Sequence, residues 1–225
     1  MTGLITAVFT TAFQAQGQAV KVDLVHPFAA GDQHGLILFF VILAILISTL
    51  IAQALVGLRG GASFGMQLLA VVVYALIAAP VAMGLATWIA GDYGSGFWAA
   101  TGLVALASAA VGAVVAGLAR LFGGAGVGLA ALVVVLLNLV SSGGPIGSQL
   151  LPDVYRWLAP AMPAGQLYSA MRSALYFDNA ALGAPIAVLG AWLAAGLVLM
   201  LLGEFVSRRR GSQVTQAGSV AGSVA

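Results

Sequence analysis

The chain has 225 residues, of which 62% are hydrophobic and only 6% carry a charge. A soluble globular domain has about a quarter of its residues charged, so the composition excludes that class. The sequence contains no cysteine, which excludes a disulfide framework and a thiolate metal site. The net charge of +2 rests on so few groups that it does not indicate nucleic-acid binding.

The first 35 residues precede the first long apolar window and form a polar lead-in to it. Their start, MTGLITAVFTTAF, is mildly apolar, but no basic residue precedes it, so it fits a signal peptide poorly. A sixth, weak span is the alternative there, although Lys21 and three glutamines follow too soon for a comfortable length. Both histidines, His26 and His34, also lie here. Two histidines in a polar segment are usually solvated, and we predict no metal site.

Five windows are apolar and long enough to cross a bilayer, for which about 20 residues are needed. The sequence therefore predicts an all-α integral membrane protein with a transmembrane domain over residues 36–206. Pro80 lies inside the second window, where it removes a backbone donor and predicts a kink. The windows are 36–58, 66–90, 97–118, 124–140 and 181–206, and the fourth is the shortest.

Basic residues determine the predicted orientation, because short cytoplasmic loops are enriched in Lys and Arg. With the C-terminus inside, Arg59, Arg120 and the run Arg208–Arg210 all lie on the cytoplasmic side, close to the ends of the windows. All five aspartates then lie on the outer side, together with the N-terminus. The tail 207–225 is small, polar and without periodicity, which predicts a disordered cytoplasmic segment.

The middle of every window lacks Asp, Glu, Lys, Arg and His. Proton relays, voltage sensors and ion-coupled carriers place such groups inside the bilayer, so these classes are disfavoured. The most polar candidates are Gln53 and Asn138. They are candidates for a transport path or, more often in membrane helices, for a hydrogen bond to a neighbouring helix.

Small residues repeat every four positions along the third window, from Ala105 to Gly117. Such a face lets helix backbones approach closely in lipid. Packing within one chain is the favoured interpretation, and a homodimer seam is the alternative.

No catalytic grouping is visible, and we predict no enzymatic activity and no cofactor. The stretch GGAGVGLA at 123–130 is rich in glycine, but it lacks the Lys-Ser/Thr pair that a phosphate-binding loop needs. Glu204 lies four residues before Arg208, which is the spacing of an ion pair on one helix face.

Residues 141–178 are too polar and too often broken by proline for a simple span, yet too apolar and patterned for a free loop. Pro152 and Pro163 each predict the start of a helix. Two helices of about 8 to 14 residues cannot cross about 30 Å of hydrocarbon. They are therefore predicted to form a re-entrant or interfacial helical hairpin on the outer side. The candidate functional residues of this hairpin are Gly143, Gly144, Pro145, Pro152, Tyr155, Arg156, Trp157, Pro160, Pro163, Tyr168 and Arg172.

The run SSGGP, followed by LLPDVYRWLAPAMP and by AMRSALYF, resembles the final outer hairpin of type-2 ABC exporter permeases. Within that superfamily, the stretch at 22–40 is similar to the Pip-like (phage infection protein) group, at the point where its large outer domain returns to the membrane. The resemblance covers roughly residues 20–206. The places that match the hairpin are held by Gly143, Gly144, Pro145, Leu151, Pro152, Pro160, Pro163 and Arg172.

This resemblance implies six spans, with a large outer domain between the first and the second. The chain is expected to correspond to spans two to six, which accounts for the odd number of windows and the outer N-terminus. The resemblance also implies an ABC ATPase in a separate chain, with Arg59 and Arg120 as candidate contacts in the short loops 58–65 and 119–124. The other expected partners are membrane lipid and a second membrane subunit, either another copy or a sister protein. No nucleic acid is expected.

The leading hypothesis is a permease subunit in the bacterial plasma membrane that helps to export an apolar or amphipathic substrate. The predicted hairpin would cap the outer end of its path. The alternative is a non-transporting surface or scaffold protein, such as a phage or envelope-assembly contact, in which aromatic and arginine residues of the hairpin carry recognition. A small channel is a weaker third hypothesis, since no charged ring is available for ion selectivity.

Overall fold

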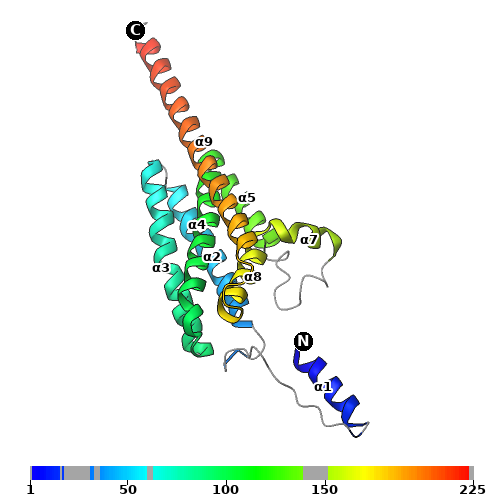
Figure 1. The fold of residues 1–225 in the computed structure, drawn as a ribbon. Helices are drawn as coiled ribbons and strands as arrows, with labels where there is room; N and C mark the ends of the chain where they lie inside the picture. Colours follow the sequence, from blue (N-terminus) through cyan, green and yellow to red (C-terminus); the bar gives the residue numbers. More distant parts are fainter. Residues whose placement is uncertain are drawn as a thin grey trace.

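The computed structural model describes residues 2–15, 17, 31–32, 36–59, 63–138 and 152–222. Within these residues the chain is all-helical and has no strand. The helices pack lengthwise into a bundle, beyond which the last helix extends (Figure 1). The predicted all-α class is therefore confirmed.

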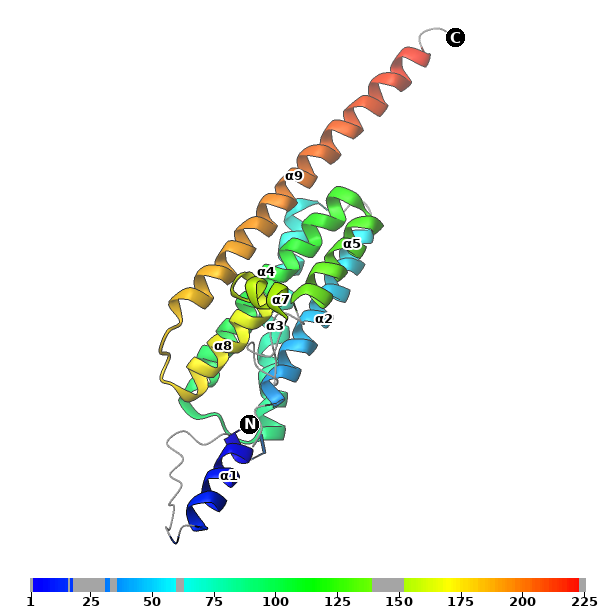
Figure 2. The ribbon, with the colours of Figure 1, turned by 90° about the vertical axis from the view of Figure 1, so that its right-hand side faces the viewer.

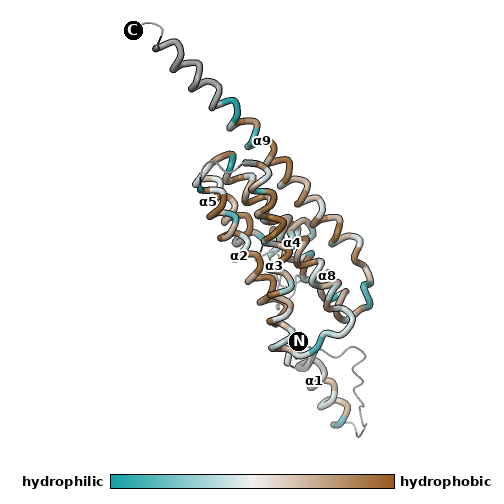
Figure 3. The backbone as a smooth tube through the Cα atoms, turned by 90° about the vertical axis from the view of Figure 1, so that its left-hand side faces the viewer, coloured by the Kyte–Doolittle hydropathy of each residue, from teal (hydrophilic) through white to brown (hydrophobic). Residues whose placement is uncertain are grey.

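Four helices are long and apolar enough to cross a membrane, which identifies the chain as a multi-pass membrane protein. They are α2 (Leu36–Leu58), α3 (Phe64–Ala90), α4 (Phe97–Phe122) and the part of α9 (Gly183–Gly222) that ends at Arg209. Apolar residues dominate the tube along the bundle, and hydrophilic ones gather toward its ends (Figure 3).

The bounds of these helices follow from local chemistry. Helix α2 begins and ends where the sequence predicts. Helix α3 starts two residues earlier than predicted, because the Ser63 hydroxyl accepts a hydrogen bond from the backbone N–H of Met66 (3.3 Å) and caps the helix. Helix α4 continues four residues beyond the predicted end and stops at Gly123, whose φ of 59° favours glycine. Arg120 therefore lies in a helix, and the prediction that it belongs to a loop is wrong.

Helix α4 lies at the centre of the bundle and contacts α2, α3, α5, α8 and α9. Of its most apolar stretch, 78% of the residues are buried, compared with 22% for the corresponding stretches of α3 and α9. A Cβ added to Gly117 would lie 2.6 Å from the Cβ of Leu199, and one added to Gly196 would lie 2.6 Å from the Cβ of Ala113. The small residues of α4 thus allow close packing against α9 within the chain.

The two ends of the bundle differ in charge. Arg59 follows α2, Arg120 lies in the last turn of α4, and Arg208 lies beside Glu204 on α9. At the opposite end, Asp32 precedes α2 and Asp92 follows α3. We call these the arginine end and the aspartate end.

The predicted fourth span, 124–140, is described as far as Asn138. It consists of helix α5 (Gly124–Ala131) and a π-helical segment (Leu132–Leu137). The described apolar stretch, Gly124–Val134, is shorter than the four helices above. Close packing of the α5 start onto α4 needs glycine, because a Cβ at Gly126 would collide with the backbone of Leu118.

Two further helices lie within the predicted hairpin, α7 (Asp153–Leu158) and α8 (Pro163–Tyr176), joined by a 3-10 turn at Ala159–Ala161. They start at the two prolines, Pro152 and Pro163, that the sequence singles out as helix starts. Helix α7 buries none of its residues, whereas α8 contributes to the main core. Gly143, Gly144, Pro145 and Leu151 lie outside the described residues.

The two terminal regions are also helical where they are described. Helix α1 spans Thr2–Gln14 within the predicted lead-in. Helix α9 continues to Gly222, through residues that the sequence predicts to be disordered. No proline follows Pro185 in the sequence to stop this helix.

Candidate functional site

Three features of the bundle combine polar groups or open space with a position inside the apolar helices. They are a charged cluster at the arginine end, a contact between Asn138 and the start of α8, and a groove between α2 and α3.

The charged cluster consists of Gln67, Arg120, Glu204 and Arg208. The Arg120 guanidinium donates a hydrogen bond to Gln67 Oε1 (2.8 Å) and forms an ion pair with the Glu204 carboxylate. Glu204 also accepts a hydrogen bond from Arg208 Nε (2.8 Å). The Arg120 side chain is only 11% exposed. The cluster therefore joins α3, α4 and α9 through one largely buried guanidinium.

The sequence predicts only part of this cluster. The spacing of Glu204 and Arg208 indicates their ion pair, but a pattern within one helix cannot show that Arg120 reaches α9 from α4. One residue of the sequence does reflect this contact. At Gly203 on α9, an added Cβ would lie 2.9 Å from Arg120 Cγ, so the glycine leaves room for the aliphatic part of the Arg120 side chain. Arg59, the other predicted ATPase contact, is exposed after the end of α2.

Two hydrogen bonds made by buried polar side chains connect helices further along the bundle. Thr49 and Ser108 share a hydrogen bond of 2.9 Å between α2 and α4. Gln53 is 1% exposed, and its Nε2 donates to the carbonyl oxygen of Ala70 on α3 (3.4 Å). Its Oε1 has no hydrogen-bond partner in the part of the chain that the structure describes. Gln53 thus connects two helices, and one of its polar atoms is buried without compensation.

The second feature is the junction between the π-helical segment and α8. Asn138 is fully buried, and its Oδ1 accepts a hydrogen bond of 2.6 Å from the backbone N–H of Ala164 in the first turn of α8. Pro163 in that turn has no N–H to satisfy, and Asn138 satisfies the N–H of the residue that follows it. The segment 124–138 and the start of α8 therefore meet inside the core.

Helix α8 is too short to cross a bilayer, because its 14 residues are about 20 Å long, compared with about 30 Å of hydrocarbon. The described part of the preceding segment, residues 124–138, is of similar length. Gly126 packs on Leu118 near the arginine end, and Gly96 packs on Ala174 near the aspartate end. Helices α5 and α8 thus lie beside different halves of α4 (Figures 1 and 2).

Helix α7 and the turn after it project from this junction. Val154 is 67% exposed and Trp157 is 81% exposed, while Arg156 pairs with Asp153 along the exposed surface. The Trp192 indole N–H of α9 donates to the carbonyl oxygen of Ala161 (2.8 Å) and fastens the turn to the bundle. The remaining predicted hairpin residues lie nearby: Pro160 and Arg172 are exposed, Tyr155 and Tyr168 are half-buried, and Arg172 lies 5.9 Å from the Tyr168 ring centre.

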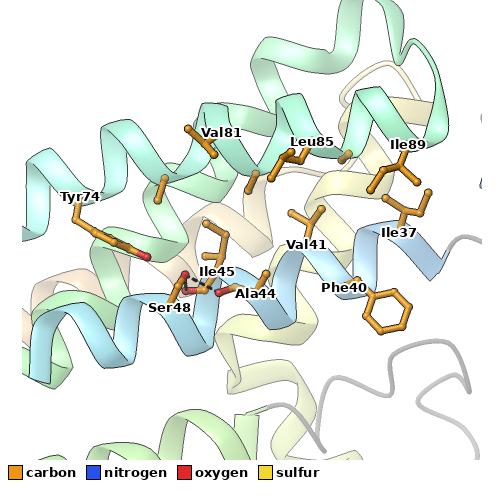
Figure 4. Close-up of a pocket in the computed structure, with 13 residues that line it drawn as sticks. Ile37, Phe40, Val41, Ala44, Ile45, Ser48, Tyr74, Val81, Leu85 and Ile89 are labelled. Carbon is orange, nitrogen blue, oxygen red and sulfur yellow. Dashed lines mark hydrogen bonds between the residues drawn. The ribbon is translucent and has the colours of Figure 1, made fainter.

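The third feature is a groove of about 510 Å³ between α2 and α3 (Figure 4). All of its lining side chains are apolar except those of Ser48 and Tyr74. The Ser48 hydroxyl donates to the carbonyl oxygen of Ala44 (2.6 Å), so its proton is used within α2. Figure 4 shows the Tyr74 ring at one end of the groove and Ile37 and Ile89 at the other.

The aspartate end carries a buried carboxylate that sequence reasoning does not single out. Asp32 is 3% exposed and accepts hydrogen bonds from the backbone N–H groups of Leu36 (2.7 Å) and Ile37 (3.2 Å). It caps α2 and suits the positive end of the helix dipole. Burial raises the pKa of Tyr93, and the nearby Tyr176 and Asp32 raise it further. The Tyr93 hydroxyl therefore stays protonated.

Within the described residues, no group of three or more His, Cys, Asp or Glu side chains has the geometry of a metal site.

The family model described as "Protein of unknown function (DUF3533)" matches residues 19–198, so the chain belongs to this family. No curated protein matches the chain.

Proposed function

We propose that this DUF3533 protein is the membrane subunit of a type-2 ABC-like exporter that moves an apolar or amphipathic substrate. An ATPase in a separate chain supplies the energy. The observation that carries the proposal is the junction at Asn138, where the segment 124–138 meets the start of the 14-residue helix α8 in the core. Interrupted helices at membrane depth are tolerated where they are buried in protein or line a cavity, and they are typical of transporters.

The proposed topology has five crossings, and α5 and α8 share the fourth. Residues 124–138 lead from the cytoplasmic side to the middle of the membrane, and α8 leads from there to the outer side. Helix α7 and the 3-10 turn after it form a re-entrant segment that leads into α8. The arginine end is cytoplasmic and the aspartate end is outside, as the positive-inside rule requires for a bacterial plasma-membrane protein.

The charged cluster closes the bundle on the cytoplasmic side in this proposal. Because Gln67 and Glu204 bind the two terminal nitrogens of Arg120, and its side chain is only 11% exposed, its guanidinium is a poor candidate for a contact with an ATPase. The exposed Arg59 is the better candidate. Apolar window centres favour a substrate that does not need charged partners inside the membrane.

Affinity purification from native membranes in mild detergent tests this proposal. We expect an ABC-type ATPase, and a second copy or a sister membrane subunit, to co-purify with the chain. Arg59→Glu should reduce the recovered ATPase, whereas Arg172→Glu, at an exposed position in α8, should not. Recovery of the intact chain with neither an ATPase nor a second membrane subunit would refute the proposal.

The exposed surface of α7 favours a second candidate function. Val154 and Trp157 are apolar side chains that remain uncovered, and aromatic residues are frequent hot spots of protein interfaces. In this alternative, the protein is a non-transporting surface or scaffold subunit whose α7 binds a partner outside the membrane. Trp157→Ser would then abolish capture of that partner without changing any ATPase activity that co-purifies.

A further inference from the structure

The groove between α2 and α3 has a regular construction. On α3, three alanines, Ala78, Ala82 and Ala86, recur every four residues, and residues at this spacing lie above one another on a helix. They form the floor of a trough that runs along the helix axis. A neighbouring row of larger side chains forms one wall, and α2 forms the other. The larger α3 residues are Val81, Leu85 and Ile89, and the α2 residues include Ile37, Val41, Ala44 and Ile45.

The groove is long and narrow. Ile37 and Ser48 are eleven residues apart on α2, which corresponds to about 16 Å, and Tyr74 and Ile89 span about 22 Å on α3. A volume of about 510 Å³ distributed over this length makes the groove an elongated trough, a shape that suits a linear molecule.

The groove is closed toward the arginine end and open toward the aspartate end. The Tyr74 ring lies at the first end (Figure 4), and one helical turn beyond it the Gln53 side chain hydrogen-bonds to Ala70 and joins α2 to α3. Near the other end, Leu85 and Ile89 are more than half exposed. A linear molecule can therefore enter from the aspartate end or from the side, and it stops at Tyr74.

The surroundings indicate what fills the groove. Both walls belong to helices that are long and apolar enough to span a membrane, so the groove lies at the depth of the hydrocarbon. Water would find few partners in it, because the hydroxyls of Ser48 and Tyr74 are the only polar side-chain groups among the lining residues, and the Ser48 hydroxyl already donates within its own helix. Trp88 and Trp98 are 83% and 74% exposed at the aspartate end, and tryptophan of this kind marks the level of lipid headgroups.

We propose that this groove is a binding site for one acyl chain of a membrane phospholipid. The headgroup lies at the level of Trp88 and Trp98, the chain runs along the alanine floor, and its methyl end lies against Tyr74. Burial of methylene groups in a preformed apolar trough stabilises the bound lipid. The site exists whether or not an ATPase partners the protein, so it does not rest on the exporter proposal.

Photo-crosslinking of the full chain in liposomes tests this inference. The probe is a phosphatidylcholine with a photoactivatable diazirine in the middle of one acyl chain, and mass spectrometry locates the adducts. We expect adducts concentrated on the α2 and α3 groove residues. Ala44→Phe, which fills the trough from an exposed position, should reduce these adducts about tenfold. The matched control, Ala195→Phe on the exposed surface of α9, should leave them unchanged.

Two outcomes would overturn the inference. The first is labelling of equal strength on α2, α3 and α9 that Ala44→Phe does not reduce, which would indicate non-specific lipid contact only. The second is efficient cross-linking between two copies through a cysteine at position 48 (S48C), which would make the groove a dimer interface. If Ala44→Phe does not fold, competition in the wild-type protein replaces it. Excess unlabelled phosphatidylcholine should suppress the groove adducts, and persistence of these adducts would refute the site.

Discussion

The α4–α9 and α2–α3 interfaces show two ways in which neighbouring apolar helices meet. Where α4 packs against α9, Gly117 of α4 and Gly196 of α9 each lie against the backbone of the other helix. At the arginine end of this interface, Arg120 forms an ion pair with Glu204. Against α2, the alanines of α3 are flanked by larger side chains, and a groove remains along much of the contact.

The difference shows that the number of small residues does not by itself decide how closely helices pack. Both interfaces contain a row of small residues. In lipid, the hydrophobic effect gives no preference for a neighbouring helix over an acyl chain. Two helices therefore pack closely where a glycine of one lies directly opposite the backbone of the other. They leave a trough between them where larger side chains keep the backbones apart. The comparison predicts that substitutions in the first interface affect stability and those in the second affect lipid occupancy.

Gly196→Leu, in the closely packed α4–α9 interface, should cause the largest loss of stability. Its Cβ would lie 2.6 Å from both Ala113 Cβ and Val114 N, which are fixed by the central helix. Overpacking of this severity should lower the free energy of unfolding by about 3 kcal/mol. Thermal unfolding in detergent, monitored by circular dichroism, measures the change. Gly84→Leu is the matched control, since Gly84 is exposed on α3 and an added Cβ there meets nothing within 4 Å.

Arg120→Gln should have the second-largest effect on stability, with a fall of several degrees in the unfolding midpoint. The change removes a largely buried guanidinium and leaves Gln67 and Glu204 without it. Arg208→Gln provides the comparison, because the Arg208 side chain is 78% exposed and exposed ion pairs contribute little. A double variant, Arg120→Met with Glu204→Met, should recover stability relative to Arg120→Gln. Equal effects of Arg120→Gln and Arg208→Gln would show that the cluster does not hold the helices together.

Asn138→Leu should have a smaller effect, confined to one junction. It removes the acceptor for the backbone N–H of Ala164 and leaves that buried donor without its partner. We expect a loss of about 1 to 2 kcal/mol and faster hydrogen exchange in the first turn of α8. Asn138→Asp, which keeps an acceptor oxygen at this position, serves as the geometric control for the cap. Unchanged exchange at α8 in Asn138→Leu would contradict the capping role.

The sequence predicts much of the fold, because crossing a bilayer imposes a strong pattern. The start and end of α2 and the start of α4 coincide with their windows, since apolar runs bounded by polar residues leave few alternatives. The helix α8 is also foreseen, because Pro163 precedes an apolar stripe at helical spacing. These are local signals within single elements.

Contacts between elements are not predicted in the same way. Nothing in one helix shows that Arg120 reaches Glu204, or that Asn138 caps a helix that starts 25 residues later. The groove likewise depends on how α2 and α3 lie against each other, although the alanine repeat at 78, 82 and 86 is visible in the sequence. The predicted fourth span is described only as far as Asn138, and hydropathy does not show that part of it is π-helical.

Gln53→Leu should have the smallest effect on stability, and it tests the open interface directly. The side chains are similar in size, and the change removes a hydrogen bond of 3.4 Å to Ala70. Hydrogen bonds between membrane helices contribute about 0.6 kcal/mol on average. Part of this loss should be offset, because the buried Oε1 that lacks a partner among the described residues also disappears. The unfolding midpoint should therefore change little, while acyl-chain adducts should extend from Tyr74 toward the arginine end as the closed end loosens. A loss of stability as large as that of Gly196→Leu would mean that one amide holds α2 and α3 as firmly as glycine packing holds α4 and α9, and the contrast between the two interfaces would fail.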